Sequence, residues 1–299
     1  MKDFNGAVAV ITGGASGLGF ALAEEAQARG CKLVIGDIRE DALKDAEEKL
    51  ALHGEVLACK VDVSRADEIE ALATAALARF GKVNLLVNNA GVFASGLTWE
   101  TSAEEYDWVI GVNQSSVIHG IRSFVPRMIA QGDDCHVLTI SSGAGITVNP
   151  GFCTYSMTKH AVLALTEALY LDLVAQGINN IGVTIAMPGM TQSGIMSPEK
   201  TTPAGLQEEL GNRKSNPVLK ALETLMTAGV AEGLPAAELA RMVFNAISGN
   251  ELYVLPAFDD ETNRAFATAV GLGRATAENP YPPVLEGFIA TLKEVEQAS

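Results

Sequence analysis

Tyr155 and Lys159 stand four residues apart, and on a helix they would share one face. A phenol titrates near pH 10, so an isolated tyrosine is a poor base at neutral pH. A neighbouring ammonium, and a bound oxidised nicotinamide with its own positive charge, would lower the pKa of Tyr155 by stabilising the phenolate. The pair therefore predicts a general acid/base that takes the proton of an alcohol as a hydride leaves for the cofactor.

Two hydroxyls precede this pair, because Ser141 and Ser142 follow the apolar run that begins at Cys135. Such a hydroxyl, placed near the phenol, hydrogen-bonds a substrate oxygen as charge develops on it. The alternative interpretation is an ordinary serine in the turn after a strand.

A glycine-rich turn, Thr12-Gly13-Gly14-Ala15-Ser16-Gly17-Leu18-Gly19, joins an apolar run to a helical pattern. Glycines allow a tight turn, and they let backbone N–H groups and the positive end of a helix approach a pyrophosphate. Taken by itself, the turn could also be only a tight corner.

The dinucleotide interpretation gains weight from Asp37, about twenty residues further on, where a carboxylate accepts hydrogen bonds from an adenosine ribose. The same carboxylate repels a 2′-phosphate, and Ser16 is neutral, so we expect NAD rather than NADP. Arg39 leaves an alternative open, since it could turn toward a phosphate. Asp62 and Val63 are candidate adenine contacts, or Asp62 only caps the following helix.

Short β-rich runs alternate with helical patterns along the chain. We predict strands at 8–12, 33–37, 56–63, 85–88, 135–141, 181–186 and 252–255. We predict helices at 18–29, 40–52, 66–80, 103–129 with a break near Gly111, 154–175 and 235–248. Repeated βα units of this kind indicate a doubly wound, seven-stranded parallel Rossmann sheet.

We expect a single dehydrogenase-type domain over residues 1–299. Residues 190–234 interrupt the βα rhythm just after a strand, so they are a natural substrate lid. Residues 258–299 form a helical extension with a proline-rich break at 280–283. This extension covers the pocket or a neighbouring subunit, or it is a surface appendage.

Composition excludes several classes of function. With 21 basic and 36 acidic residues the net charge is −15, which disfavours nucleic acid and anionic lipid as partners. The four cysteines are widely spread and the histidines lack ligand spacing, so we expect reduced thiols, a cytoplasmic protein and no metal site. The two long stretches without charged residues, 137–158 and 173–198, hold Gly, Pro, Asn and hydroxyls, and this argues against membrane spans.

The expected pocket walls are apolar, without clustered Arg or Lys to hold a carboxylate or phosphate. This favours a bulky, uncharged alcohol or ketone, although each wall residue could instead belong to the core. The candidates are Phe93, Ile146, Val148, Phe152, Met190, Ile195 and Met196.

All these motifs together resemble the short-chain dehydrogenases/reductases, over nearly the whole chain. The glycine turn matches T-G-x-x-x-G-x-G, residues 88–91 match N-N-A-G, and Pro188-Gly189 matches the P-G after the sixth strand. Asn113, Ser142, Tyr155 and Lys159 stand where that family carries its catalytic tetrad. The chain departs from the family in its greater length and its C-terminal extension.

The resemblance implies a role for each matching residue. It makes Tyr155 the acid/base and Ser142 the group that orients the substrate oxygen. It implies that Lys159 binds the nicotinamide ribose and lowers the pKa of Tyr155, and that Asn113 holds a water of the proton relay. Asn89 supports the sheet and the cofactor, and Ser193 replaces the usual threonine that contacts the carboxamide. The remaining cofactor contacts implied are Gly13, Ser16, Gly17, Leu18, Gly19, Asp37, Ile38, Asp62, Val63, Ala90, Gly91, Pro188 and Gly189.

Three strings, residues 106–113, 124–130 and 252–256, resemble bacterial dehydrogenases that oxidise the benzylic Cα alcohol of lignin-type aryl ethers. The leading hypothesis is therefore NAD-dependent oxidation of a bulky aromatic secondary alcohol, or the reverse reduction. A steroid-like or aliphatic hydroxyl is the alternative substrate, and a non-catalytic NAD sensor is the alternative class. The family further implies a homodimer or homotetramer formed through the long helices 103–129 and 154–175.

Overall fold

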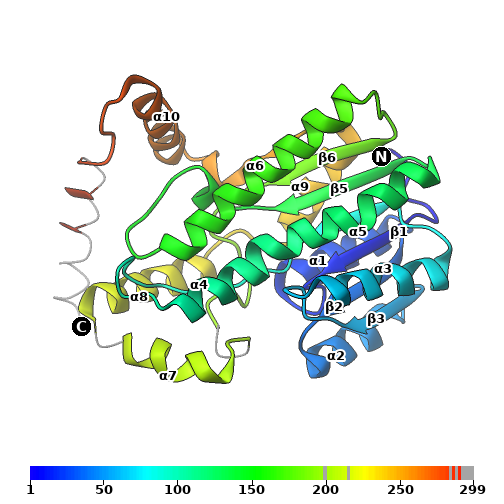
Figure 1. Ribbon diagram of the computed structural model, residues 1–299, viewed down its shortest axis with the longest axis horizontal. Coiled ribbons are helices and arrows are strands. Elements are labelled where there is room, and N and C mark those ends of the chain that lie inside the picture. Colours follow the sequence, from blue (N-terminus) through cyan, green and yellow to red (C-terminus); the bar gives the residue numbers. More distant parts are fainter. Residues whose placement is uncertain (198–200, 214–215, 283–284, 287–288, 291–299) are drawn as a thin grey trace.

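The computed structural model describes residues 1–197, 201–213, 216–282, 285–286 and 289–290. Its centre is a seven-stranded, all-parallel sheet in the order β3-β2-β1-β4-β5-β6-β7 (Figure 1). The strands are β1 Val8–Thr12, β2 Lys32–Asp37, β3 Val56–Lys60, β4 Leu85–Asn88, β5 Cys135–Ile140, β6 Ile181–Ala186 and β7 Tyr253–Val254. The expected doubly wound Rossmann sheet is therefore confirmed.

Helices cover both faces of the sheet (Figure 1). The helices are α1 Gly17–Ala28, α2 Glu40–Leu50, α3 Ala66–Phe80, α4 Ala103–Ile110, α5 Ser116–Gln131, α6 Cys153–Ala175 and α9 Ala236–Gly249. Between β6 and α9 lie α7 Ala204–Arg213 and α8 Pro217–Ala231, and after β7 comes α10 Glu261–Thr276. Within the described residues, no helix has both the length and the apolar character that crossing a bilayer requires.

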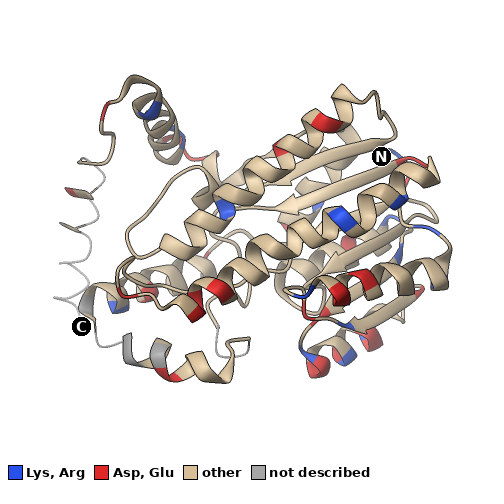
Figure 2. Cartoon of the chain, in the orientation of Figure 1, with Lys and Arg blue, Asp and Glu red and all other residues tan. Residues whose placement is uncertain are grey.

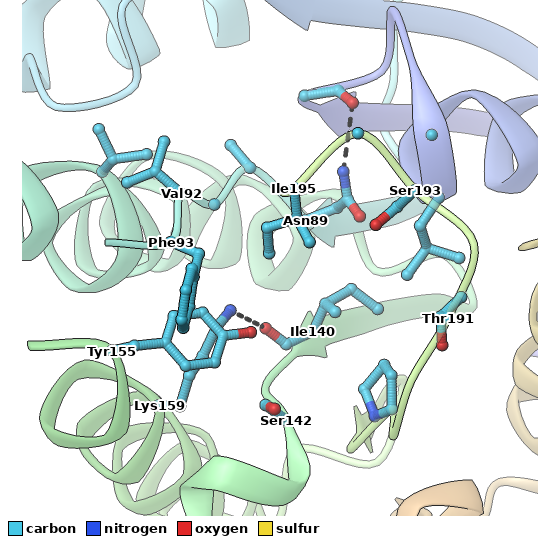
Figure 3. A pocket seen from close by; sticks show the side chains of 18 of the residues that line it. Asn89, Val92, Phe93, Ile140, Ser142, Tyr155, Lys159, Thr191, Ser193 and Ile195 are labelled. Carbon is cyan, nitrogen blue, oxygen red and sulfur yellow. Dashed lines mark hydrogen bonds between the residues drawn. The ribbon is translucent and has the colours of Figure 1, made fainter. Parts of the chain in front are cut away.

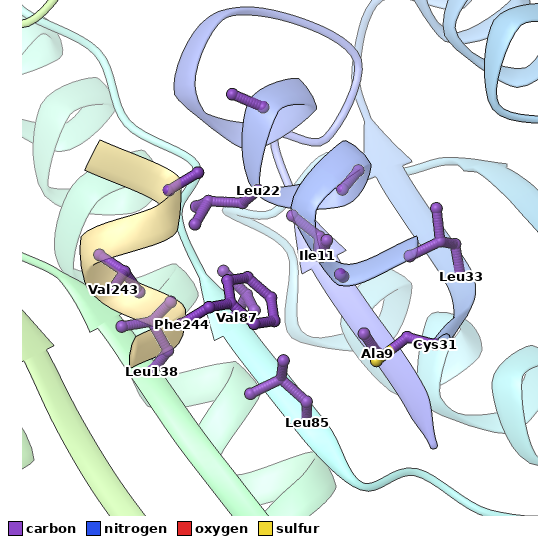
Figure 4. Close-up of a cluster of buried hydrophobic side chains, with 14 of the residues drawn as sticks. Ala9, Ile11, Leu22, Cys31, Leu33, Leu85, Val87, Leu138, Val243 and Phe244 are labelled. Atoms are coloured by element: carbon purple, nitrogen blue, oxygen red, sulfur yellow. The ribbon is translucent and has the colours of Figure 1, made fainter. Parts of the chain in front are cut away.

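The central strands β1, β4 and β5 are buried on both faces because their side chains alternate between two hydrophobic cores. In β1, Ala9 and Ile11 join the core beneath α1 and α9, and Val8 and Val10 join the core beneath α3 and α5. The first core is closed by Phe244 of α9, which reaches the sheet beside Val87 and Leu138 (Figure 4). Charged residues gather on outer helices such as α2 and α3 (Figure 2).

Three strands are shorter than predicted: β5, which ends at Ile140 one residue early, and, by more, β3 and β7. β3 ends at Lys60 instead of Val63, because its partner β2 ends at Asp37, the residue paired with Lys60. After that point Asp62 turns the chain into α3 by accepting hydrogen bonds from the backbone and side chain of Ser64. β7 is reduced to Tyr253–Val254, whose only pairing among the described strands is with Ile185 and Ala186.

The predicted helix over residues 103–129 is broken near Gly111, as expected, but by one wide π-helical turn, Gly111–Ser115, which carries Asn113. Such turns insert one extra residue into a helix and are frequent at functional sites. α4 and α5 continue on either side of it.

Candidate active site

A cavity of about 680 Å³ opens at the carboxyl ends of the parallel strands. It lies where the sheet order reverses between β1 and β4, the place where ligands bind in sheets of this type. Every predicted cofactor contact lines this cavity: Gly13, Ser16, Gly17, Leu18, Gly19, Asp37, Ile38, Asp62, Val63, Asn89, Ala90, Gly91, Tyr155, Lys159, Pro188, Gly189 and Ser193.

The glycine turn is built so that backbone lines the cavity. Gly13 has a φ of +64°, and a Cβ on Gly19 would lie only 2.0 Å from the carbonyl oxygen of Gly13. Asn89 holds the turn from the next strand, since its Nδ2 donates to the carbonyls of Thr12 (2.9 Å) and Gly13 (3.2 Å). Ser16, at the N-cap of α1, makes no side-chain capping bond, so the N–H groups of this helix end remain available to an anion.

Asp37 is fixed at the end of β2, 7% exposed. Its Oδ2 accepts the backbone N–H of Ala15 at 3.2 Å, and its Oδ1 accepts that of Arg39 at 3.1 Å. The Arg39 guanidinium donates to Ser16 Oγ at 2.7 Å, and its Nε lies 3.8 Å from the Asp37 carboxylate. Both possibilities raised by the sequence, a carboxylate and a nearby guanidinium, therefore meet at this end of the cavity.

Asp62 has a structural role at the start of α3, which was the alternative to an adenine contact. Its Oδ1 accepts the N–H (3.0 Å) and the hydroxyl (2.6 Å) of Ser64, which begins the turn before α3. Asp62 and Val63 nevertheless line the cavity, so a contact to a bound base is compatible with this turn.

Tyr155 and Lys159 lie one turn apart on α6, and Ser142 faces them from the end of β5 (Figure 3). The Ser142 hydroxyl oxygen accepts the backbone N–H of Ala144 at 3.2 Å. The Tyr155 ring packs edge-on against Phe93, with 5.2 Å between ring centroids. A substrate oxygen placed between the two hydroxyls meets both of them.

The Lys159 ammonium donates to the carbonyl of Ile140 at 2.9 Å, and its Nζ lies 5.6 Å from the Tyr155 ring centroid (Figure 3). Burial lowers the pKa of Lys159 to about 8. Burial raises the pKa of Tyr155, and the nearby Ser142 hydroxyl offsets this only in part. From the sequence we expect the ammonium to lower the pKa of the phenol, but in the structure the ammonium is turned toward the backbone carbonyl of Ile140.

Asn113 lies behind the cavity rather than in its wall. Its Oδ1 accepts the N–H of Val92 at 2.8 Å, and its Nδ2 donates to the carbonyl of Val92 at 3.0 Å and to Thr158 Oγ1 at 3.2 Å. A Cβ on Gly91 would lie 3.5 Å from Asn113 Oδ1 and 3.6 Å from Lys159 Nζ. The missing side chain of Gly91 therefore leaves space between these two polar groups.

Five predicted wall residues line the substrate end of the cavity: Phe93, Phe152, Met190, Ile195 and Met196. Ile146 and Val148 do not, and Val148 is 38% exposed on the surface. The reason is the tight turn at 143–145, whose Gly143 carbonyl accepts the N–H groups of both Ile146 and Thr147. This turn directs Thr147 and Asn149 to the cavity instead.

Several wall residues were missed by the sequence argument because distant segments supply them. α4 contributes Trp108, α8 contributes Met226 and Val230, and the segment after β7 contributes Ala257, Phe258 and Asn263. The apolar spacing of α8 was the one available signal. Among the described wall residues of the cavity, charged side chains occur only at the nucleotide end and at Lys159.

The comparisons with known proteins agree with this geometry. The family model described as short chain dehydrogenase matches residues 7–204. A C alpha-dehydrogenase of Sphingobium sp. strain SYK-6 is 35% identical over 267 residues, 86% of this chain and 82% of the relative. A CLA biosynthesis dehydrogenase/reductase of Lactiplantibacillus plantarum is 31% identical over 271 residues, 88% of this chain and 94% of the relative.

Among solved structures, a short chain dehydrogenase/reductase from Burkholderia phymatum in complex with NAD is similar, with a TM-score of 0.87 and 38% identity. The match covers 94% of this chain and 98% of that one.

Proposed function

The chain belongs to the short chain dehydrogenase family, and from that premise we propose that it transfers hydride between NAD(H) and a bulky, uncharged, aromatic secondary alcohol or ketone. The observation that carries the proposal is that Ser142 faces Tyr155, with Lys159 one helical turn away, in a cavity whose other end is a glycine-rich nucleotide turn (Figure 3).

We assign the proton to the Tyr155 phenol. In the oxidation direction, the Tyr155 phenolate takes the hydroxyl proton of the substrate and becomes the phenol, while Ser142 holds the same substrate oxygen by a hydrogen bond. The Lys159 ammonium stabilises negative charge on the phenol when it turns from Ile140 toward Tyr155 and a bound ribose. Asn113 fixes the backbone of Val92, next to Phe93, which packs against the Tyr155 ring.

NAD fits the residues of the nucleotide end. The turn has no room for a Cβ at Gly13 or Gly19, so only backbone stands where a pyrophosphate would approach. The N-terminus of α1 faces the same space. Asp37 presents a carboxylate to the 2′-hydroxyl of an adenosine ribose. When bound, the oxidised nicotinamide supplies the acceptor for the hydride.

The wall residues at the substrate end of the cavity support an aromatic substrate. Phe93, Phe152 and Trp108 offer ring faces and edges, and three methionines, Met190, Met196 and Met226, adapt to irregular apolar shapes. The Sphingobium relative is named for dehydrogenation at a Cα position. A steroid-like or aliphatic hydroxyl is the second substrate candidate, because the same apolar side chains would also pack against a non-aromatic substrate.

Residues 190–234 act as the lid in this proposal; 198–200 and 214–215 of this range lie outside the described residues. The lid is joined to the loop after β4 by a 2.8 Å hydrogen bond from Ser95 Oγ to Glu223 Oε1 of α8, and Leu222 packs beside it against Phe93 and Phe152. The proposed contact surface of a homodimer or homotetramer is formed by α4 and α5, which cover the predicted helix 103–129, and by α6.

The deciding experiment follows NADH formation by ultraviolet absorbance, with NAD and a panel of benzylic, steroidal and aliphatic secondary alcohols, and NADP in parallel. Turnover that is fastest with bulky benzylic alcohols and NAD supports the proposal. Faster turnover of steroidal alcohols replaces the substrate class and keeps the mechanism. Tight NAD binding without turnover of any class favours a non-catalytic NAD-binding protein.

A further inference from the structure

Thr158 lies between Tyr155 and Lys159 in the sequence, and its side chain is fully buried. Its hydroxyl accepts a hydrogen bond from Asn113 Nδ2 at 3.2 Å. The Thr158 hydroxyl donates its proton to the backbone carbonyls at the start of α6. Its oxygen lies 2.9 Å from the carbonyl oxygen of Tyr155 and 3.0 Å from that of Thr154. One hydroxyl therefore joins the π-helical turn to the backbone of the turn of α6 that carries the phenol.

Asn113, the donor to this hydroxyl, uses both amide hydrogens and its carbonyl oxygen in hydrogen bonds. Asn113, 1% exposed, uses its remaining amide hydrogen and its carbonyl oxygen on the backbone of Val92. The next residue, Phe93, packs its ring against Tyr155. The chain of contacts thus runs from α6 through Thr158, Asn113 and the loop after β4, and it returns to the ring of Tyr155.

We propose that Thr158 is a positioning residue for Tyr155, acting through Asn113 and the Val92–Phe93 loop. The inference rests on the proposed function, in which Tyr155 exchanges the proton. A hydroxyl is required at this position because the group must accept from Asn113 and donate to a backbone carbonyl at the same time. An apolar side chain of equal size fills the space but can do neither.

Thr158→Val keeps the shape of the side chain and removes this double role. The change leaves an amide hydrogen of Asn113 buried without a partner, and a buried donor in that state is costly. The amide then loses its fixed orientation, and the bonds to Val92 weaken with it. We expect kcat to fall about tenfold while the KM for NAD changes little, because the adenosine end of the cavity shares none of these contacts.

Thr166 provides a matched control on the same helix. It is equally buried, and its hydroxyl bonds to the carbonyl of Val162 at 2.7 Å and to Thr139 Oγ1 at 3.1 Å. Thr166→Val therefore removes a buried helical hydroxyl, two turns from Thr158, without touching Asn113. Thr158→Ser restores the hydroxyl and should return kcat to within about twofold of the original value.

The experiment combines steady-state kinetics with hydrogen exchange at the Val92 amide, which donates a hydrogen bond to Asn113 Oδ1. In Thr158→Val this amide should exchange about tenfold faster, and it should exchange at the original rate in Thr158→Ser and Thr166→Val. Equal kcat values and equal Val92 exchange in Thr158→Val and Thr166→Val would overturn the proposal. If Thr158→Val does not fold, Thr158→Ala removes the hydroxyl without the second methyl group.

Hydrogen exchange needs no substrate, so the experiment distinguishes a failure of the proposed function from a failure of the proposed role of Thr158. Absence of turnover in the unmodified protein removes the proposed function, whereas unchanged exchange at Val92 in Thr158→Val removes the role of Thr158. Faster exchange with an unchanged kcat also overturns the inference, because the link would then have no effect on the position of Tyr155.

Discussion

The Lys159 ammonium donates a 2.9 Å hydrogen bond to the carbonyl oxygen of Ile140, at the last residue of β5. The next residue of the chain, Ser141, donates its hydroxyl to the carbonyl of Lys159 itself, also at 2.9 Å. The end of one central strand therefore holds both the side chain and the backbone of this lysine. The position of the charge is set by β5, and burial in that place lowers the pKa of Lys159 to about 8.

This lowered pKa predicts a dependence of stability on pH. The unfolded chain holds the Lys159 proton up to about pH 10.4, and the folded chain releases it near pH 8, so the unfolded state binds more protons in between. The contribution of Lys159 to stability must therefore rise with pH across this window. Relative to Lys159→Met, the unfolding free energy of the unmodified protein should rise by about 2 kcal/mol between about pH 7 and about pH 10.

Urea unfolding at several pH values measures this difference, and comparison at each pH cancels the groups common to both proteins. The raised pKa of Tyr155 affects stability only above its ordinary value of 10.0, at the upper edge of the window. Lys220→Met, at an exposed lysine of α8, is the control and should show no trend. A flat difference for Lys159→Met would mean that the ammonium is not desolvated as the fold indicates.

Asp37 predicts the choice between NAD and NADP. Asp37→Ala removes the carboxylate that repels a 2′-phosphate, and it leaves Arg39 and Ser16 beside the space that the phosphate would occupy. We expect the ratio of kcat/KM with NAD to that with NADP to fall at least tenfold. Kinetics with both cofactors test this, and an unchanged ratio would show that Asp37 does not contact the ribose.

The role of Arg39 is separated by the double variant Asp37→Ala, Arg39→Ala. If the guanidinium binds the phosphate once Asp37 is gone, NADP activity gained by the single variant is lost again in the double variant. Asp41→Ala, at an exposed carboxylate in the first turn of α2, controls for a general change in charge.

The Ser95–Glu223 hydrogen bond predicts how firmly α8 closes the substrate end. Glu223→Ala removes a hydrogen bond to a charged group, of a kind that typically contributes about 1.5–3 kcal/mol in protected surroundings and less where water reaches it. We expect the KM for a bulky alcohol to rise about threefold to tenfold, with an unchanged dissociation constant for NAD. Glu232→Ala, at the exposed C-terminal end of α8, should leave both constants unchanged, and equal effects of the two variants would exclude the link.

Much of the fold was predictable because local signals and packing agree. The strands at Val8–Thr12, Leu85–Asn88 and Ile181–Ala186 and the helix Ala66–Phe80 lie where their patterns placed them. Strand ends were harder to predict, because the length of β3 depends on where its neighbour β2 stops. That information lies in the pairing of the two strands and not in the sequence of either one alone.

The site shows the same division. The sequence predicts Tyr155, Lys159 and Asp37 because each belongs to a motif whose residues are close together in the chain, within one helix or one βα unit. Phe258 and Asn263 come from a segment about a hundred residues beyond Tyr155, and only the folded chain brings them to the cavity. The hydroxyl of Thr158 was overlooked for a related reason, since its partner Asn113 lies 45 positions away.

Tyr155→Phe isolates the proton transfer itself. The change removes one oxygen and keeps the ring that packs against Phe93, so the wall of the cavity is retained. General acid/base groups typically contribute about 10²- to 10⁴-fold, and we expect kcat to fall by that range while the dissociation constant for NAD stays within about twofold. Tyr170→Phe, on an outer turn of the same helix, is the control and should keep its activity. Stopped-flow measurement of NADH formation and calorimetric titration of NAD binding give the two quantities. A Tyr155→Phe protein that turns over at a near-normal rate would exclude the phenol as the proton acceptor, and the search would then move to Ser142 and Lys159.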